Sequence, residues 1–586
     1  MAEQGMDATG VERDRQIIRE GKKKGRGGTV WAYTRLSGPG WLQSAITLGG
    51  GSLSGSLYLG VLAGFSLLWL QPLAMILGVI MLSAISYVTL STGERPFDAI
   101  NKHVNPVMGW GWALATMMAN LVWSLPQFSL GTAALQQNLL PGVFGVEGVL
   151  GEYGKHVACI GILAVSVVVV LLYDSGRKGI ALFEIVLKIM VGVVIVCFFG
   201  VVVKMTFTRE GLNWGFIFKG LIPDIRLLWS PAPSLNESLA AVEPAFRDFW
   251  RNTIVSQQRD VMITAAATAV GINMTFLLPY SMLKKGWDRE FRGLAIFDLS
   301  TGLFVPFILA TGCVVIASSA RFHATPAAGL VKELTAEGEV IQSSPKLEGA
   351  YKSLAFRRAI SENPSLKSEV DAIQNDEGKA QRIDAIVEAL PLADRKMAAM
   401  LVKRDAFDLA KSLEPLTGSI FSQYLFGIGV VGMAISSIII LMLINGFVVC
   451  EIFGLEQGGW PHRIGCLMPA VGAAGPFFWK QAAPWLAVPT SVFGMVLIPI
   501  AYFTFFLVMN EKELMGDSMP QGRRRVVWNV LMAIAAGLAA FGSLWSLWSK
   551  LHYKGLALFG AFVLLALVWH FVFPRKKGAL EASTEP

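Results

Sequence analysis

Apolar runs of about 20 residues recur along this chain and are separated by short polar segments. A helix needs about 20 apolar residues to cross the hydrocarbon core of a bilayer. The pattern predicts twelve membrane-spanning helices, near residues 38–63, 66–90, 107–138, 156–173, 179–204, 260–283, 293–319, 418–449, 463–479, 484–509, 526–548 and 555–573. The ninth of these runs is the weakest.

The first apolar run carries three consecutive glycines at its middle, Gly49, Gly50 and Gly51, followed by Ser52. A membrane helix keeps its backbone groups bonded internally, so a break at mid-depth is tolerated only beside a cavity, a bound ion or water. Transporters built from inverted repeats place discontinuous helices at their substrate site. We therefore expect a site at this break.

The sixth run has a similar interruption, with Gly271 and Asn273 near its middle and Pro279 after them. Interruptions at corresponding places in two five-helix halves indicate an inverted repeat with a central site. Close helix packing is the alternative, because small residues four apart, such as Gly51 and Gly55, also let helices approach each other.

Composition supports a membrane protein. Of the 586 residues, 53% are hydrophobic and 16% are charged, and the mean hydropathy is +0.53, which is not typical of soluble domains. The five cysteines show no CxxC or Cys/His spacing, so neither a zinc site nor a disulfide scaffold is indicated. No phosphate loop, nucleophile elbow or HExxH is found, so we expect neither an enzyme nor a cofactor.

Basic residues gather in alternate loops, although the net charge of +8 could by itself suggest nucleic-acid binding. Cytoplasmic loops are enriched in Lys and Arg, so the basic residues are topology signals that place both termini in the cytoplasm and the chain in the plasma (inner) membrane. The predicted divisions are a basic tail at 1–35, spans at 36–320 with an external loop at 205–259, an external helical insertion at 321–417, spans at 418–573 and a cytoplasmic tail at 574–586.

The first span resembles the opening span of the Nramp divalent-metal transporters, which reads GPGF, a DPGN break and a GY-LLW-like stretch. The matching residues are Gly38, Pro39, Gly40, Trp41, Gly64, Leu67, Leu68 and Trp69, and further similarity lies at Gly131 to Ala133, in LFGIGVVGMAISS of the eighth span and in KELMG at Lys512 to Gly516. The resemblance implies an all-α polytopic fold with a leucine-transporter-like five-plus-five inverted repeat, broken first and sixth spans and two appended spans.

The family's metal ligands are replaced in this chain. In the family, the aspartate and asparagine of DPGN and the methionine of an MPH stretch hold the metal, and these positions fall here on Gly49, Ser52 and Asn273. The histidine position falls on Thr275, and the acidic residues of the family's third span have no counterpart. The remaining groups near the breaks are neutral, and Met274 is the only sulfur close to them.

Three further candidates come from the spans. Ser436 and Ser437 lie in the eighth span, where leucine-transporter relatives bind sodium, although serines in membrane helices also bond to their own carbonyls. Glu184 is an intramembrane carboxylate, which indicates either proton coupling or a structural pair with Lys188 four residues on. Gln127 faces either the cavity or a neighbouring helix.

We therefore expect a secondary transporter that works by alternating access and carries a small ion or solute across the lipid bilayer. The resemblance implies a divalent cation, and the neutral residues favour a hard, magnesium-like ion over manganese or iron. The alternatives are a sodium-coupled carrier of a small organic solute and a non-transporting receptor on the same scaffold. The expected substrate-binding residues are Thr47, Gly49, Ser52, Gly271, Asn273, Met274 and Thr275, with Ser436, Ser437 and Glu184 as candidates for cation binding or coupling.

Overall fold

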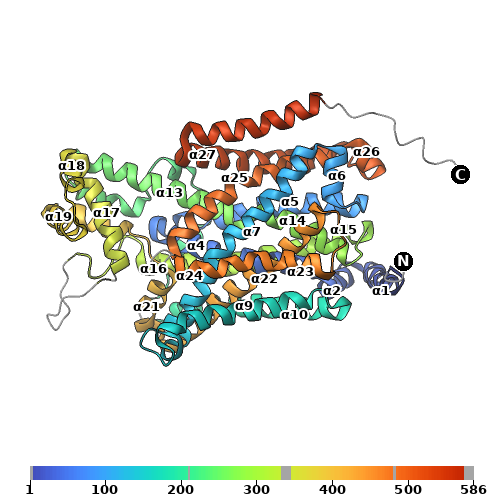
Figure 1. Ribbon diagram of the computed structural model, residues 1–586, viewed down its shortest axis with the longest axis horizontal. Helices are drawn as coiled ribbons and strands as arrows, with labels where there is room; N and C mark the ends of the chain where they lie inside the picture. The colour runs from blue at the N-terminus through green and yellow to red at the C-terminus, as the bar shows by residue number, and fades with distance from the viewer. Residues whose placement is uncertain (1–3, 209–210, 332–342, 344, 479–482, 573–586) are drawn as a thin grey trace.

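The computed structural model of the chain describes residues 4–208, 211–331, 343, 345–478 and 483–572, and within these ranges it is built of helices without a strand (Figure 1). The bundle consists of α3 (Pro39–Thr47), α4 (Gly50–Ala63), α5 (Leu70–Thr92), α7 (Pro106–Ala134), α9 (Gly154–Leu172), α10 (Gly176–Thr206), α13 (Arg247–Ala269), α14 (Ile272–Lys284), α15 (Arg292–Asp298), α16 (Val305–Phe322), α22 (Phe426–Ile452), α23 (Gly459–Leu467), α24 (Gly475–Phe478), α25 (Ala483–Met509) and α27 (Gly522–Val572).

Each predicted span coincides with one or two of these helices. The last two spans form α27, which reverses at His552, a non-glycine residue with a φ of 49°. Within the described part of the chain, six helices are long and apolar enough to cross a membrane, or up to eight if each of two bent helix pairs is one span. The other predicted spans are formed by shorter, broken or more polar helices, such as α13 and α14.

Both predicted breaks are present. Helices α3 and α4 meet at Leu48 and Gly49 with a bend of 57°, and α13 and α14 are separated by extended backbone at Val270 and Gly271. The φ angles of Gly49 and Gly271 are −122° and −89°, which any residue can adopt. Glycine is needed there for closeness instead, because an added Cβ would lie 2.5 Å from Ser437 Oγ at Gly49 and 2.6 Å from the Trp123 ring at Gly271.

The helix that carries the first half of the sixth predicted span begins before the predicted apolar run. Helix α13 starts at Arg247, 13 residues before the expected start at 260 (260 − 247 = 13). Its polar residue Gln258 binds the segment that precedes the helix: Gln258 Nε2 donates to the carbonyls of Leu227 and Ser230 at 2.9 Å each, and its Oε1 accepts from Ala232 N. Because positions such as Gln258 are polar, the pattern of apolar runs does not predict the first part of α13.

The basic N-terminal segment folds into two helices, α1 (Gln4–Lys23) and α2 (Gly25–Leu36). Arg15 and Arg19 pair with Asp288 and Glu290 in the loop before α15, each at 2.6 Å. The predicted tail at 574–586 lies outside the described residues.

The predicted external insertion is helical. It contains α17 (Pro345–Glu362), α18 (Ser365–Asp371), α19 (Asp376–Ala389), α20 (Leu392–Leu401) and α21 (Ala406–Thr417). Helix α21 packs against α16, α10 and α4, so this part of the insertion belongs to the bundle rather than to a separate unit.

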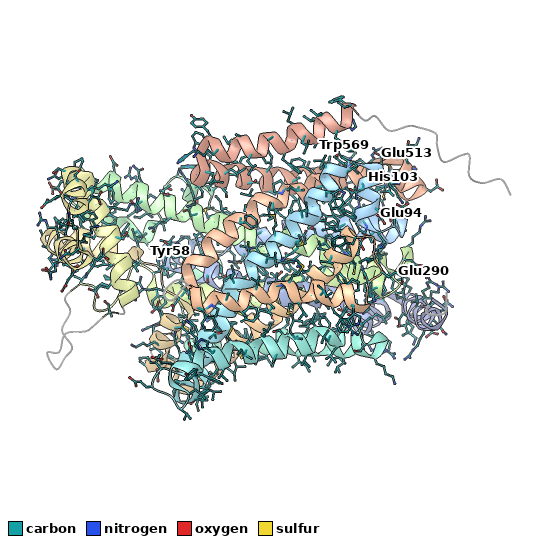
Figure 2. The ribbon with its side chains drawn as sticks, viewed as in Figure 1. Tyr58, Glu94, His103, Glu290, Glu513 and Trp569 are labelled. Carbon is teal, nitrogen blue, oxygen red and sulfur yellow. The ribbon has the colours of Figure 1, made fainter. Side chains whose placement is uncertain are left out.

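The two ends of the bundle differ. Figure 1 shows α1, α2, α15 and α26 (Lys512–Met515) at one end, and α17, α18 and α19 at the other. In Figure 2, Glu94, His103, Glu290 and Glu513 lie toward the first end, and Tyr58 lies toward the second. The breaks lie between these ends, where α14 and the middle of α22 are almost entirely buried.

Candidate functional site

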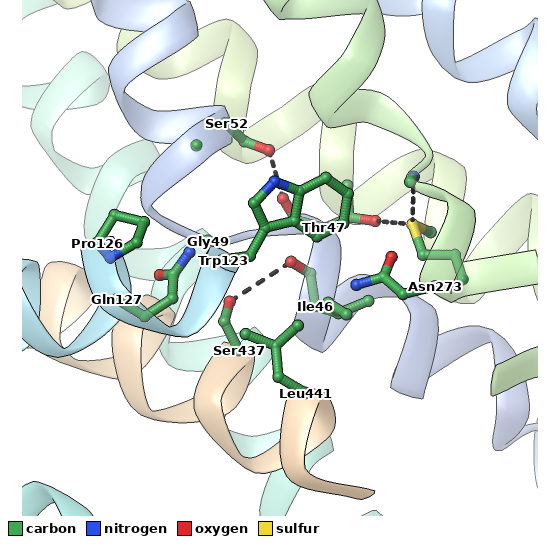
Figure 3. Close-up of a pocket in the computed structure, with 13 residues that line it drawn as sticks. Ile46, Thr47, Gly49, Ser52, Trp123, Pro126, Gln127, Asn273, Ser437 and Leu441 are labelled. Atoms are coloured by element: carbon green, nitrogen blue, oxygen red, sulfur yellow. Dashed lines mark hydrogen bonds between the residues drawn. The ribbon is translucent and has the colours of Figure 1, made fainter. Parts of the chain in front are cut away.

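A cavity of about 50 Å³ lies at the point where the two breaks meet (Figure 3). It is lined by residues of both broken helices, of α7 and of α22: Ile46, Thr47, Gly49, Gly51, Ser52, Trp123, Pro126, Gln127, Gly271, Asn273, Met274, Ser437 and Leu441. Among the described residues, those that line the cavity carry hydroxyl and amide groups and no charged side chain.

Side chains bind the backbone groups that the first break releases. Gln127 Oε1 accepts from Gly50 N at 2.9 Å, and the Ser52 hydroxyl donates to the carbonyl of Thr47. Unpaired backbone groups inside a membrane are costly, so these bonds stabilise the backbone at the break.

Met274 carries the only sulfur among the described residues that line the cavity, and this sulfur is already engaged. Thr47 Oγ1 donates to Met274 Sδ at 3.1 Å, and Gly271 N donates to the same sulfur at 3.4 Å. Met274 therefore links the two breaks, and its lone pairs are directed at protein donors rather than at a ligand.

Ser436 and Ser437 connect α22 to the end of α3. Ser437 Oγ lies 3.4 Å from the carbonyl oxygens of both Ala45 and Ile46, and Ser436 Oγ lies 3.0 Å from that of Ala45. Ser436 also bonds to the carbonyl of Met433 in its own helix. This is the bonding that serines in membrane helices are expected to show if they do not bind sodium. Two hydroxyls and two carbonyls thus converge beside the cavity.

The predicted substrate residues are brought together except for one. Thr47, Gly49, Ser52, Gly271, Asn273 and Met274 line the cavity with Gln127 and Ser437. Thr275 is absent from the lining: it accepts a bond from Trp112 Nε1 at 2.9 Å, and its own hydroxyl donates to the carbonyl of Ile272. Ser436 is behind Ser437 and also does not line the cavity.

Glu184 lies away from the cavity, beside the start of α3. It forms an ion pair with Lys285 at 2.9 Å, whereas Lys188 donates to the carbonyl of Ser37. The structural partner of Glu184 is therefore Lys285 rather than the predicted Lys188. An added Cβ on Gly38 would lie 2.6 Å from Glu184, and Gly38 precedes Thr47 by nine residues, or roughly 14 Å of helix.

Asp298 serves the same helix end. Its carboxylate accepts from Gly40 N at 2.7 Å, from Gly38 N at 3.1 Å and from the Ser37 hydroxyl. A carboxylate at the N-terminus of a helix satisfies free N–H groups and stabilises the helix dipole. These intramembrane charges therefore anchor α3.

Sequence reasoning missed Trp123 and Leu441 in the cavity wall, and Asn120 and Asn445 next to it. Asn120 bonds to Asn273 and to Asn445, and all three are buried. An asparagine within an apolar span is a signal that could have identified both, because such residues seek partners on other helices. Among the described residues, no group of three or more His, Cys, Asp or Glu residues is placed to hold a metal ion.

Comparison with solved structures shows the fold. A histidine-to-alanine variant of the Eremococcus coleocola manganese transporter aligns with a TM-score of 0.59 and 14% identity, covering 93% of this chain and 95% of that chain. The same transporter in complex with an aromatic bis-isothiourea substituted compound aligns with a TM-score of 0.59 and 13% identity, covering 93% and 94%. These matches confirm the predicted architecture.

Comparison by sequence shows the family. Among curated proteins, none matches the chain. The Nramp family, described as natural resistance-associated macrophage protein-like, matches residues 40–356 and 393–548, which is most of the chain and includes both breaks. The chain therefore belongs to the Nramp family, whose members are membrane transporters of metal ions and not enzymes.

Proposed function

We propose that this chain is a secondary transporter of a divalent cation that selects a hard, partly hydrated ion such as magnesium over manganese or iron. The observation that carries the proposal is the neutral cavity between the two breaks, whose polar side chains offer hydroxyl and amide oxygens. Manganese and iron gain more than magnesium from sulfur and imidazole ligands. Gly49 and Ser52 stand where the family has its aspartate and asparagine, and Met274 is occupied by Thr47 and Gly271.

The size of the cavity supports partial hydration. A cavity needs about 10–15 Å³ of water-accessible volume to hold one water, so about 50 Å³ has room for an ion with a few waters rather than a full hydration shell. Without a carboxylate, desolvation of a divalent ion is compensated only by dipoles. We therefore expect the cavity to bind the divalent cation weakly, which suits a cation that is abundant.

The orientation is part of the proposal. We infer that the end of the bundle with α1 and α2 faces the cytoplasm and that the insertion faces outward, in the plasma (inner) membrane. The basic residues Lys284, Lys285, Arg289 and Arg292 run from the last residue of α14 to the first of α15. Figure 1 shows α15 at that same end, in agreement with the positive-inside rule.

The test is cation uptake into sealed proteoliposomes that hold an ion-sensitive dye. We expect saturable magnesium entry and manganese entry with a KM that is at least about tenfold higher. Protein-free liposomes provide the control. Manganese entry with the lower KM would overturn the hard-ion preference, and no entry of either ion would overturn divalent-cation transport.

A second candidate, a sodium-coupled carrier of a small organic solute, is favoured by the four oxygens at Ser436, Ser437, Ala45 and Ile46. Sodium binds to hydroxyl and carbonyl oxygens of this kind without a formal charge. Solute uptake that needs an inward sodium gradient, and that is lost in Ser437→Ala, would support this candidate. Magnesium uptake without sodium would exclude it.

A further inference from the structure

Three asparagine side chains from three different spans are joined head to tail beside the cavity. Asn273 Nδ2 of α14 donates to Asn120 Oδ1 of α7 at 3.2 Å, and Asn120 Nδ2 donates to Asn445 Oδ1 of α22 at 3.1 Å. All three are buried, and only Asn273 lines the cavity. We call this row the amide relay.

The relay ends in two atoms that have no partner among the described residues, Asn273 Oδ1 and Asn445 Nδ2. A buried amide group without a partner is destabilising. Asn273 Oδ1 is next to the break, since an added Cβ on Gly271 would lie 2.7 Å from it. A cation in the cavity would supply the missing partner of this oxygen.

The direction of the relay decides which end of the Asn273 amide faces the cavity. An amide has an acceptor oxygen on one side and a donor NH₂ on the other. Because each amide donates to the next, the three must turn together to reverse the direction. In the observed direction Asn120 holds the NH₂ of Asn273, and the oxygen is left for a ligand. The reverse direction would leave an NH₂, which repels cations.

We propose that Asn120 and Asn445 are positioning residues, which hold the Asn273 oxygen toward the cavity and so make it a ligand for a hard cation. This inference rests on the proposed function and adds to it residues that never touch the substrate. Outer partners that orient a metal ligand commonly change metal affinity by about 10–100-fold when they are removed. A purely structural contact between spans would change stability without changing affinity.

Two variants at Asn445 test the relay without altering the cavity wall. Asn445→Asp keeps an acceptor for Asn120 Nδ2 and therefore keeps the direction, whereas Asn445→Leu removes it and lets Asn120 and Asn273 turn. We expect the KM for magnesium uptake to rise about tenfold in Asn445→Leu and to stay within about twofold of the wild type in Asn445→Asp, with the maximal rate little changed in both.

A purely structural role predicts an unchanged KM in both variants and a larger loss of stability in Asn445→Asp, because burying the Asp carboxylate harms folding more than placing an apolar Leu there. An unchanged magnesium KM in Asn445→Leu, or a larger KM in Asn445→Asp than in Asn445→Leu, would overturn the inference. Asn120→Leu provides a second variant, expected to raise the KM at least as much as Asn445→Leu because it removes the partner of Asn273 directly.

A binding readout separates this inference from the proposed function. Magnesium should raise the melting temperature of the purified wild-type protein, and the concentration needed should be about tenfold higher for Asn445→Leu. Wild-type protein that neither takes up nor is stabilised by magnesium would overturn the proposed function and the relay with it. Wild-type uptake combined with an unchanged Asn445→Leu would overturn the relay alone.

Discussion

Gly49 shows how one residue sets the charge of the site. Its backbone is extended and would accept any side chain, but an added Cβ would lie 2.5 Å from Ser437 Oγ and 3.2 Å from Gln127 Nε2. A carboxylate therefore cannot be added at Gly49 unless the Ser437 hydroxyl moves. The position of Ser437 therefore leaves no room for an aspartate side chain at Gly49, where the family has one.

The double variant Gly49→Asp, Ser437→Ala should convert the cavity into a charged site. Removing the Ser437 hydroxyl makes room for the Asp side chain, whose carboxylate compensates the desolvation of a divalent ion. We expect the KM for manganese uptake to fall by about tenfold or more relative to the matched control Gly49→Ala, Ser437→Ala. Equal KM values for the two double variants would contradict this prediction.

At the scale of elements, His323 joins three segments of the chain. It follows α16, its Nδ1 donates to the carbonyl of Val61 in α4 at 2.9 Å, and its Nε2 accepts from the hydroxyl of Ser234 in the segment before α13. Burial lowers the pKa of His323 below its ordinary value of 6.5, although the bond to Val61 opposes this effect. The neutral imidazole is therefore the form that fits these contacts.

This histidine should make the folded protein less stable as the pH is lowered. A lowered pKa in the folded state means that the unfolded chain binds the proton more readily, so stability is complete above about pH 6.5 and declines as pH falls below it. We expect the melting temperature of the wild type to drop between about pH 7 and pH 5 more than that of His323→Gln, which carries no titrating group. Identical pH profiles for the two proteins would refute this explanation.

At the scale of the whole molecule, the insertion is fastened to a broken helix. Trp250 Nε1 of α13 donates to Asp394 Oδ1 at 2.6 Å, and Arg358 Nε donates to the same oxygen at 2.9 Å. Arg358 and Asp394 are fully buried, and the Arg358 guanidinium lies 3.3 Å from the centre of the Phe246 ring. Any movement of α13 during transport would therefore move the insertion as well.

Arg358→Ala should loosen this attachment. Removing one partner of a buried ion pair leaves an uncompensated charge and costs about 3–5 kcal/mol. We expect faster proteolysis within residues 345–401 than in the wild type, while the bundle stays folded. The neighbouring Arg357→Ala is the control, since Arg357 is exposed. Equal cleavage rates in the two variants would show that the pair does not hold the insertion.

The positions of the spans and of both breaks could be predicted from residues alone, because apolar length and glycine clusters act locally. The start of α13 could not, since its polar residues are satisfied by a loop that precedes it in the sequence. Glu184 illustrates the same limit: Lys188 is near in sequence, but Lys285 from the end of α14 is the residue that reaches it.

By itself the sequence determined that this is a membrane bundle with two interrupted spans and a neutral centre, because hydropathy, helix breaking and charge are properties of each residue. Only the tertiary structure decided which neutral groups face the cavity and which bond to other groups of the protein. Thr275 bonds to Trp112 instead of lining the cavity, and Met274 accepts a bond from Thr47. Asn273 is held by Asn120, which lies 153 positions away in the sequence. Such contacts depend on how helices pack in three dimensions, and a linear pattern does not contain that information.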